Sequence, residues 1–189
     1  SENHHPGIDN SGPFLAMNPF SSRCCQHNHA QGWPYYSEHL ILATPDNGAA
    51  IALYAACKAT LKVADGQEIT LHEQTNYPFE EKISFTVNTT EDVRFPFYLR
   101  IPSWCDQPEL AINGKQKEID PIPGKYIYID RTWTDGDKVE LNLPMKLSIR
   151  TWQVNKNSVS VNYGPLTLSL KINEEYIQKD SRSTAIYDS

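Results

Sequence analysis

The chain changes its pattern of apolar and polar residues near residue 44. Before that point there is no period of two, and residues 34–43 predict a short helix starting at Pro34, because proline suits the first helical position. From about residue 50 onward, apolar residues alternate with polar ones, as in half-buried β-strands. About ten short strands follow at intervals of roughly eight to twelve residues, which favours a β-sandwich or barrel. Residues 1–23 predict an extended loop.

The predicted strands are bounded by residues that favour tight turns. Asp65-Gly66 and Asn113-Gly114 are typical of hairpins, and Asp135-Gly136 is interpreted in the same way. Pro96 should confine its strand to a sheet edge or a bulge, because proline donates no hydrogen bond to a neighbouring strand. We expect strands at residues 50–57, 60–63, 68–73, 82–88, 94–101, 110–112, 126–129, 138–143, 147–152, 159–161 and 166–172.

Composition and charge exclude some classes of function. The chain has 189 residues, of which 39% are apolar and 21% charged, and its net charge is −6. It has no basic patch, which makes nucleic acid a poor partner, and no apolar run near the roughly 18 residues of a membrane helix. Its four cysteines are not the dense framework of a small disulfide-rich domain. Cys57 ends an apolar run and is expected to be a buried, inert thiol.

The residues best suited to chemistry are Cys24-Cys25-Gln26-His27-Asn28-His29. Thiolate and imidazole ligands suit zinc, but adjacent cysteines point in different directions, so one loop rarely closes a tetrahedral site. A small zinc-binding protein using Cys24, Cys25, His27 and His29 is one interpretation. A partial site completed elsewhere, a vicinal disulfide and two ordinary thiols are others. A thiolate beside a metal or a protonated histidine is also a nucleophile.

Carboxyl groups and aromatic rings provide other candidates. Glycoside cleavage uses two carboxyl groups about 5–9 Å apart. We interpret four available glutamates as solvated strand or turn residues instead: Glu38, Glu73, Glu80 and Glu81. Aromatic side chains that could stack on sugars, and so make the chain a stand-alone carbohydrate-binding module, are Trp33, Tyr35 and Trp104. A role in a hydrophobic core or interface is the competing interpretation, and Trp104 and Trp133 could each cap the core.

Several short motifs follow one another in order between residues 21 and 172. They are Cys24-Cys25-x-x-Asn28, Asn47-Gly48, Tyr77-Pro78, Leu99-Arg100-Ile101-Pro102-Ser103-Trp104-Cys105, Ile112-Asn113-Gly114, Arg131-x-Trp133-x-x-Gly136-Asp137, Leu143-Pro144-Met145 and Gly164-Pro165-Leu166. The series resembles the family 127 glycoside hydrolases of the β-L-arabinofuranosidase type. Gln26-His27 departs from the usual pattern, and Gly32-Trp33-Pro34 interrupts a segment that is usually one continuous helix. These departures leave the sugar specificity open.

The resemblance implies a C-terminal fragment of a larger enzyme. Such enzymes join an (α/α)6 barrel to C-terminal β-sandwich domains. Cys24 matches their nucleophile and a zinc ligand, and Cys25 matches a second zinc ligand. Their third cysteine, glutamate ligand and acid/base glutamate have no counterpart here. The partner expected from the resemblance is therefore the missing barrel, with zinc and a plant-type glycan bound by the intact parent.

We expect a mainly β chain built around an antiparallel, jelly-roll-like sandwich. Residues 1–44 would be a loop and short helix left from the catalytic barrel. Residues 45–146 would form the sandwich, and residues 147–189 would lead into or complete a second β domain. The resemblance implies that this fragment supports the barrel and is inactive alone. For the parent protein, a periplasmic or secreted location is slightly favoured over others.

Overall fold

A computed structural model describes residues 23–173, with side chains from residue 31 onward. The described residues belong to two compact units, one formed by residues up to 37 together with 170–173, and the other by residues 38–169. None of the helices in this part of the chain has the length and apolar character needed to cross a membrane.

Helix α1 spans Arg23–Glu38 and runs through Pro34 without a break. The predicted helix at 34–43 and the predicted interruption at Gly32-Trp33-Pro34 are therefore wrong. None of residues 23–33 is β-branched, so this segment is compatible with a helix that begins well before Pro34 and continues through it despite the lost hydrogen bond and the steric cost of an interior proline. The rest of the predicted N-terminal loop, residues 1–22, lies outside the described residues.

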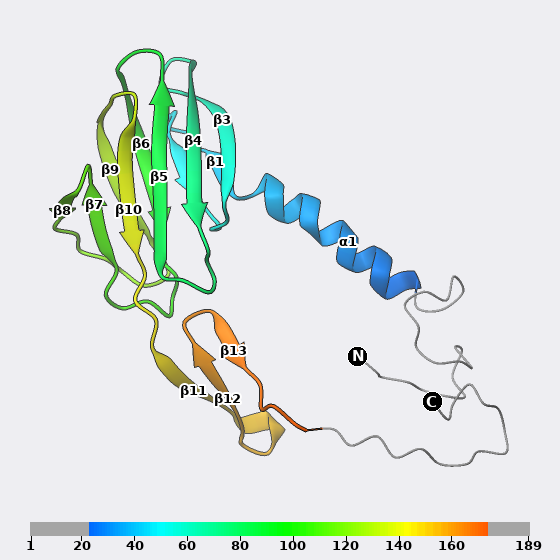
Figure 1. Cartoon of the computed structure of the whole chain (residues 1–189). Helices are drawn as coiled ribbons and strands as arrows, with labels where there is room; N and C mark the ends of the chain where they lie inside the picture. The colour runs from blue at the N-terminus through cyan, green and yellow to red at the C-terminus, as the bar shows by residue number, and fades with distance from the viewer. Residues whose placement is uncertain (1–22, 174–189) are drawn as a thin grey trace, which may run out of the picture. The chain divides into compact units, whose positions relative to one another are not determined.

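Two β-sheets pack face to face in the unit of residues 38–169 (Figure 1). One sheet has the order β1-β2-β6-β9 and the other the order β3-β4-β5-β10-β7-β8. Only β2 and β6 pair in parallel among these strands. The prediction of a mainly β, antiparallel sandwich is confirmed. The strands are β1 (Ile41–Ala43), β2 (Ala49–Ile51), β3 (Cys57–Val63), β4 (Gln67–Thr75), β5 (Lys82–Thr89), β6 (Val93–Arg100), β7 (Glu109–Ile112), β8 (Lys115–Lys117), β9 (Tyr126–Trp133) and β10 (Asp137–Asn142).

The alternation of apolar residues places one face of each sheet in a common core. Fully buried side chains come from β5 in one sheet and from β6 in the other, and the ring of Trp133 in β9 contacts the rings of both Phe95 and Phe97. The Trp133 indole N–H donates to the Phe95 carbonyl oxygen at 3.0 Å. Trp133 is thus part of the core, while Trp104 packs against it and is only half-buried.

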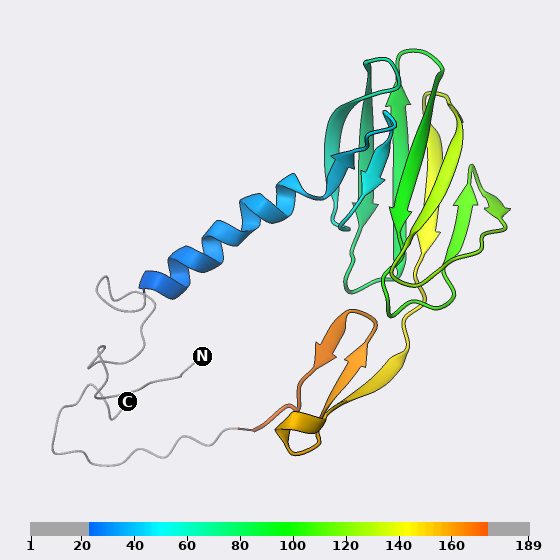
Figure 2. The same ribbon diagram turned by 180° about the vertical axis from the view of Figure 1, so that it is seen from behind.

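The Asp65-Gly66 and Asn113-Gly114 turns do join hairpins, β3–β4 and β7–β8. The Asp135-Gly136 turn does not, because β9 pairs with β6 in one sheet and β10 pairs with β5 and β7 in the other. This turn carries the chain across the sandwich (Figure 2). A local turn signal fixes a change of direction but not the strand that each arm pairs with.

Two further strand predictions need correction. The predicted strand 50–57 is divided, because β2 ends at Ile51 and β3 begins at Cys57. Pro96 lies in β6, an interior strand rather than an edge strand. Pairing of β6 with β2 begins only at Phe97, so β2 offers no partner at the position of Pro96.

A separate three-stranded sheet follows the sandwich in sequence. It consists of β11 (Leu147–Trp152), β12 (Ser158–Tyr163) and β13 (Leu166–Leu168), with the 3-10 turn η1 (Gln153–Asn155) between the first two. The predicted strand 166–172 is therefore shorter than expected. Cross-strand pairing gathers the apolar residues on one face, which is formed by Leu147, Ile149, Thr151, Val159, Val161, Tyr163, Leu166 and Leu168. Every residue of β11 is exposed.

Candidate functional site

Cys24 and Cys25 lie in the first turn of α1, on helical backbone rather than in the predicted loop. The structure describes no side chains before residue 31, so their roles as nucleophile and zinc ligands stay predictions, as do those of His27 and His29. Among the residues with described positions, no three His, Cys, Asp or Glu side chains come together as a metal site would require.

The three aromatic residues proposed for sugar binding do not lie in one unit. Trp33 and Tyr35 of α1 are 60% and 67% exposed, and Trp33 also contacts Tyr36 edge-on at 6.2 Å between ring centroids. Trp104 belongs to the sandwich and packs against its core. Their role in carbohydrate binding stays a prediction.

Glu73 is the main correction among the glutamates. It was expected to be solvated, but it is 0% exposed, on the inner face of β4. Its Oε1 accepts the backbone N–H of Ala55 at 3.1 Å, and its Oε2 accepts the Cys57 thiol at 3.8 Å. Burial raises the pKa of Glu73 to about 8, although these hydrogen bonds favour the charged form. The carboxyl group anchors the segment between β2 and β3, which has no strand partner of its own.

The two cysteines outside α1 have the character of neutral thiols. Cys57 is half-buried rather than fully buried, and burial together with the nearby Glu73 raises its pKa to about 11. Cys105 is buried, and burial raises its pKa as well. A thiol in this state is a poor nucleophile at neutral pH.

The remaining glutamates have structural surroundings. Glu38 and Glu80 are exposed, as expected, and Glu80 accepts a hydrogen bond from Asn76 at 3.0 Å. Glu81 is half-buried, and its Oε1 accepts the backbone N–H of Met145 at 2.6 Å. This bond fixes the end of the sandwich next to β11.

The Asn-Gly and Arg-x-Trp-x-x-Gly-Asp motifs meet in one hydrogen-bonded cluster, which we call the clasp. The Asp137 carboxylate accepts the side-chain amide of Asn113 at 2.6 Å and the backbone N–H of Thr134 at 3.1 Å, and it pairs with Arg131 at 3.1 Å. The Asn113 side chain in turn accepts the Lys138 N–H at 2.8 Å. The clasp ties β9, which belongs to one sheet, to β7 and β10, which belong to the other.

Electrostatics agree with a structural role for the clasp. Burial alone would raise the pKa of Asp137, but the hydrogen bonds from Asn113 and Thr134, with the charge of Arg131, hold it below its usual value. Arg131 also lies over the Trp133 ring, 5.0 Å from its centroid. The hydrogen bonds and the ion pair of the clasp connect β9 with Asn113 and with β10, so these motif residues stabilise the turn across the sandwich.

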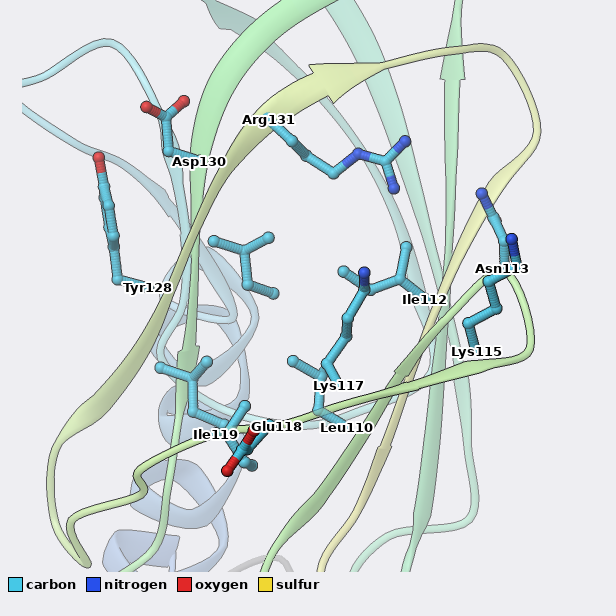
Figure 3. Close-up of a pocket in the computed structure, with 12 residues that line it drawn as sticks. Leu110, Ile112, Asn113, Lys115, Lys117, Glu118, Ile119, Tyr128, Asp130 and Arg131 are labelled. Carbon is cyan, nitrogen blue, oxygen red and sulfur yellow. The ribbon is translucent and has the colours of Figure 1, made fainter.

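A groove of about 650 Å³ opens between the β7–β8 hairpin and β9 (Figure 3). Its floor is aliphatic, formed by Leu110, Ile112, Ile119, Ile127 and Ile129. Lys115 and Lys117 also line it. Sequence reasoning missed this groove, although the Asn113-Gly114 hairpin pairs Lys115 with Ile112 and Lys117 with Leu110, which puts both lysines on the core-facing side.

The family match is found in the sandwich. Residues 48–145, just over half of the chain, match the family described as β-L-arabinofuranosidase, GH127 middle domain. A search of curated proteins found no match.

Three solved structures resemble the chain. A GH127 β-L-arabinofuranosidase from Geobacillus stearothermophilus T6 has 31% identity and a TM-score of 0.70, covering 78% of this chain and 24% of that one. A protein described as a glycoside hydrolase has 27% identity and a TM-score of 0.69, over 81% of this chain and 28% of that one. A GH127 β-arabinofuranosidase has 27% identity and a TM-score of 0.66, over 76% and 25%.

The chain therefore spans about a quarter of the length of these structures. The resemblance that the ordered motifs indicated is confirmed, and it is centred on the sandwich rather than on a catalytic barrel. The chain belongs to the GH127 β-L-arabinofuranosidase family.

Proposed function

We propose that this chain is the β-sandwich portion of a GH127 glycoside hydrolase, that it supports the catalytic barrel, and that it is inactive alone. The observation that carries the proposal is the match of residues 48–145 to the middle domain of the family. The resemblance implies a barrel of about a dozen helices, whereas the described part of the chain has one α-helix. The chain also covers only about a quarter of each solved relative.

In the intact parent, Cys24 would be the nucleophile, and Cys24 and Cys25 would be two of the zinc ligands. Two thiols suit zinc in kind but supply half of a tetrahedral site, so the parent must provide the remaining ligands. When bound, zinc would favour the deprotonated form of the thiols at neutral pH. The described cysteines do not compete for this role, because Cys57 and Cys105 have raised pKa values.

The helical backbone of α1 supports a shared site over a self-contained one. An α-helix turns about 100° per residue, so residues 24, 25, 27 and 29 are spread over about 200° of its circumference. Four ligands of a single ion would have to gather on one side. A small zinc protein built on this segment alone is therefore the weaker proposal, as is a carbohydrate-binding module that needs the half-buried Trp104.

Hydrolysis assays test the proposal in two arms. The 189-residue chain, supplied with Zn²⁺, should release no aryl group from an aryl β-L-arabinofuranoside above the blank rate. Turnover by this chain that Cys24→Ala abolishes would refute inactivity. In a longer polypeptide that includes the barrel, Cys24→Ala should abolish turnover, whereas the matched control Cys57→Ala should retain it. Equal activity of both variants would remove Cys24 from its proposed role.

A further inference from the structure

The strand β9 is the last strand of its sheet and has one unused edge. It pairs with β6 along all of Tyr126–Trp133, and no described strand lies on its other side. No proline interrupts it. An edge of this length is able to accept a further strand by main-chain hydrogen bonds.

The groove beside this edge is already lined for side chains of an added strand. Ile127 and Ile129 of β9 form one side of the aliphatic floor, and Leu110 and Ile112 of the hairpin form the other side. Strands within a sheet lie about 4.8 Å apart, so a single extended segment is the natural occupant of the space next to β9. The groove volume, about 650 Å³, is within the usual range for a binding pocket.

Four of the five charged residues that line the groove fall into two groups. Asp130 and Arg131 already have partners, since Asp130 accepts two hydrogen bonds from Arg94, at 3.1 and 2.9 Å, and Arg131 pairs with Asp137 at 3.1 Å. Lys115 and Lys117 pair with none of the described residues, although both line the groove and Figure 3 draws them beside its aliphatic floor. Glu118, the remaining charged residue of the lining, lies next to Ile119.

The spacing of these lysines matches that of a strand. Lys115 and Lys117 are two residues apart on β8, so they lie on the same face, about 6.8 Å apart along the strand. Acidic residues two apart in an added strand have the same spacing. The residue two positions further along the added strand has its side chain on the same face, where it would contact the aliphatic floor of the groove.

We propose that this groove binds an extended segment of a partner polypeptide by strand addition to β9. The segment presents two acidic side chains, two residues apart, to Lys115 and Lys117, and an apolar side chain on the same face to the floor. The recognition is independent of glycoside hydrolysis and uses no residue of the cysteine pair.

A labelled peptide tests this directly. The probe is acetyl-Thr-Glu-Thr-Glu-Thr-Leu-Thr-amide with a fluorophore, titrated with the 189-residue chain and followed by anisotropy. We expect saturable binding that falls at least tenfold in the double variant Lys115→Glu, Lys117→Glu. The matched control Lys58→Glu, Lys62→Glu carries the same charge change on exposed residues of β3 and should bind as the unaltered chain does.

Two further kinds of probe separate strand addition from simple attraction and need no change in the protein. A peptide with lysine in place of glutamate should not bind. Two peptides, N-methylated at the even or at the odd positions, keep their side chains, and the one that loses the main-chain donors facing β9 should bind at least tenfold more weakly. The proposal is overturned if the original peptide does not bind, if the groove variant binds unchanged, or if N-methylation has no effect. In those cases the lysines serve only to keep other edges away.

Discussion

The sandwich and the three-stranded sheet β11–β13 share the same alternation of residues but differ in what covers them. In β5 the apolar positions Ile83, Phe85 and Val87 are fully buried between two sheets. In β11 the corresponding positions Leu147 and Ile149 are about 70% exposed, at 69% and 72%. The pattern therefore specifies a strand and its apolar face, whereas burial depends on whether a second layer is present.

The largest difference should appear when one apolar residue is removed from each region. Phe97→Ala in the core of the sandwich should lower the free energy of unfolding by about 4 kcal/mol, because it leaves a cavity among packed aromatic rings. Ile149→Ala should lower it by less than about 0.5 kcal/mol, because its side chain already meets solvent. Urea unfolding of the full chain measures both. Similar losses would mean that the apolar face of β11 is covered in solution.

Removing a polar contact should produce a smaller difference in stability between the two regions than removing an apolar side chain. Asp137→Asn weakens the ion pair with Arg131 in the clasp and should cost about 3 kcal/mol. Ser160→Ala removes the acceptor of the Trp152 indole N–H, a bond of 3.2 Å in the exposed sheet, and should cost at most about 1 kcal/mol. The same urea experiment compares them, and equal losses would contradict a special role for the clasp.

The Asp137 contribution should also depend on pH. Its pKa is lower in the folded chain, so the stabilisation is complete above the unfolded value near 3.8 and is lost as pH falls through the folded value. The free energy of unfolding, measured from pH 7 down to pH 3, should therefore decrease less steeply in Asp137→Asn than in the unaltered chain. A loss as steep as that of the unaltered chain would assign the acid sensitivity to other carboxyl groups.

Two glycines allow the same substitution to be compared in both regions. A Cβ at Gly48 would lie 2.2 Å from the backbone oxygen of Pro96, so Gly48→Ala should cost about 2 kcal/mol. At Gly164, next to β12, a Cβ would meet the flexible side chain of Met145, and φ is +54°. Gly164→Ala should cost about 1 kcal/mol through its positive φ. Thermal unfolding monitored by circular dichroism shows which variant loses more stability. A larger loss of stability in Gly164→Ala than in Gly48→Ala would contradict this prediction.

A last comparison concerns the pH dependence that the buried carboxyl group of the sandwich gives to stability. Burial raises the pKa of Glu73 from 4.5 to about 8, so the folded chain holds a proton that the unfolded chain releases between these values. Stability should therefore fall as pH rises through this window, by at most about 1.4 kcal/mol per pH unit. Glu73→Gln should flatten this dependence, while Glu80→Gln, at an exposed position, should leave it unchanged. A dependence that survives Glu73→Gln would trace to another group.

Local sequence rules predicted the parts of the fold that depend on neighbouring residues. The hairpins at Asp65-Gly66 and Asn113-Gly114 and the core faces of β5 and β10 follow from turn chemistry and alternation. The parallel pairing of β2 with β6 and the crossing at Asp135-Gly136 depend on partners distant in sequence, so no local rule contains them.

The same limit applies to the candidate sites. In the sequence, Glu73 has the pattern of an exposed polar residue in a strand with one buried face. Its burial is explained by the segment between β2 and β3, whose Ala55 N–H donates to its carboxyl group. The sequence does not indicate the start of α1, because Gly32 and Pro34 are unfavourable helix residues that lie inside the helix. The groove became visible only when β7, β8 and β9 were placed in space.

The position of β10 has a consequence for how the chain is made. β10 lies between β5 and β7 in the sheet and is the last of these three strands in sequence. Lys82 of β5 therefore has no pairing partner on this side until Asn142 of β10 has been synthesised. On the ribosome, the six-stranded sheet stays split until β10 emerges, with the unpaired edges of β5 and β7 open to chaperones or to other nascent chains. Nascent chains arrested before residue 137 should therefore be digested by protease, and chains released beyond residue 146 should resist it.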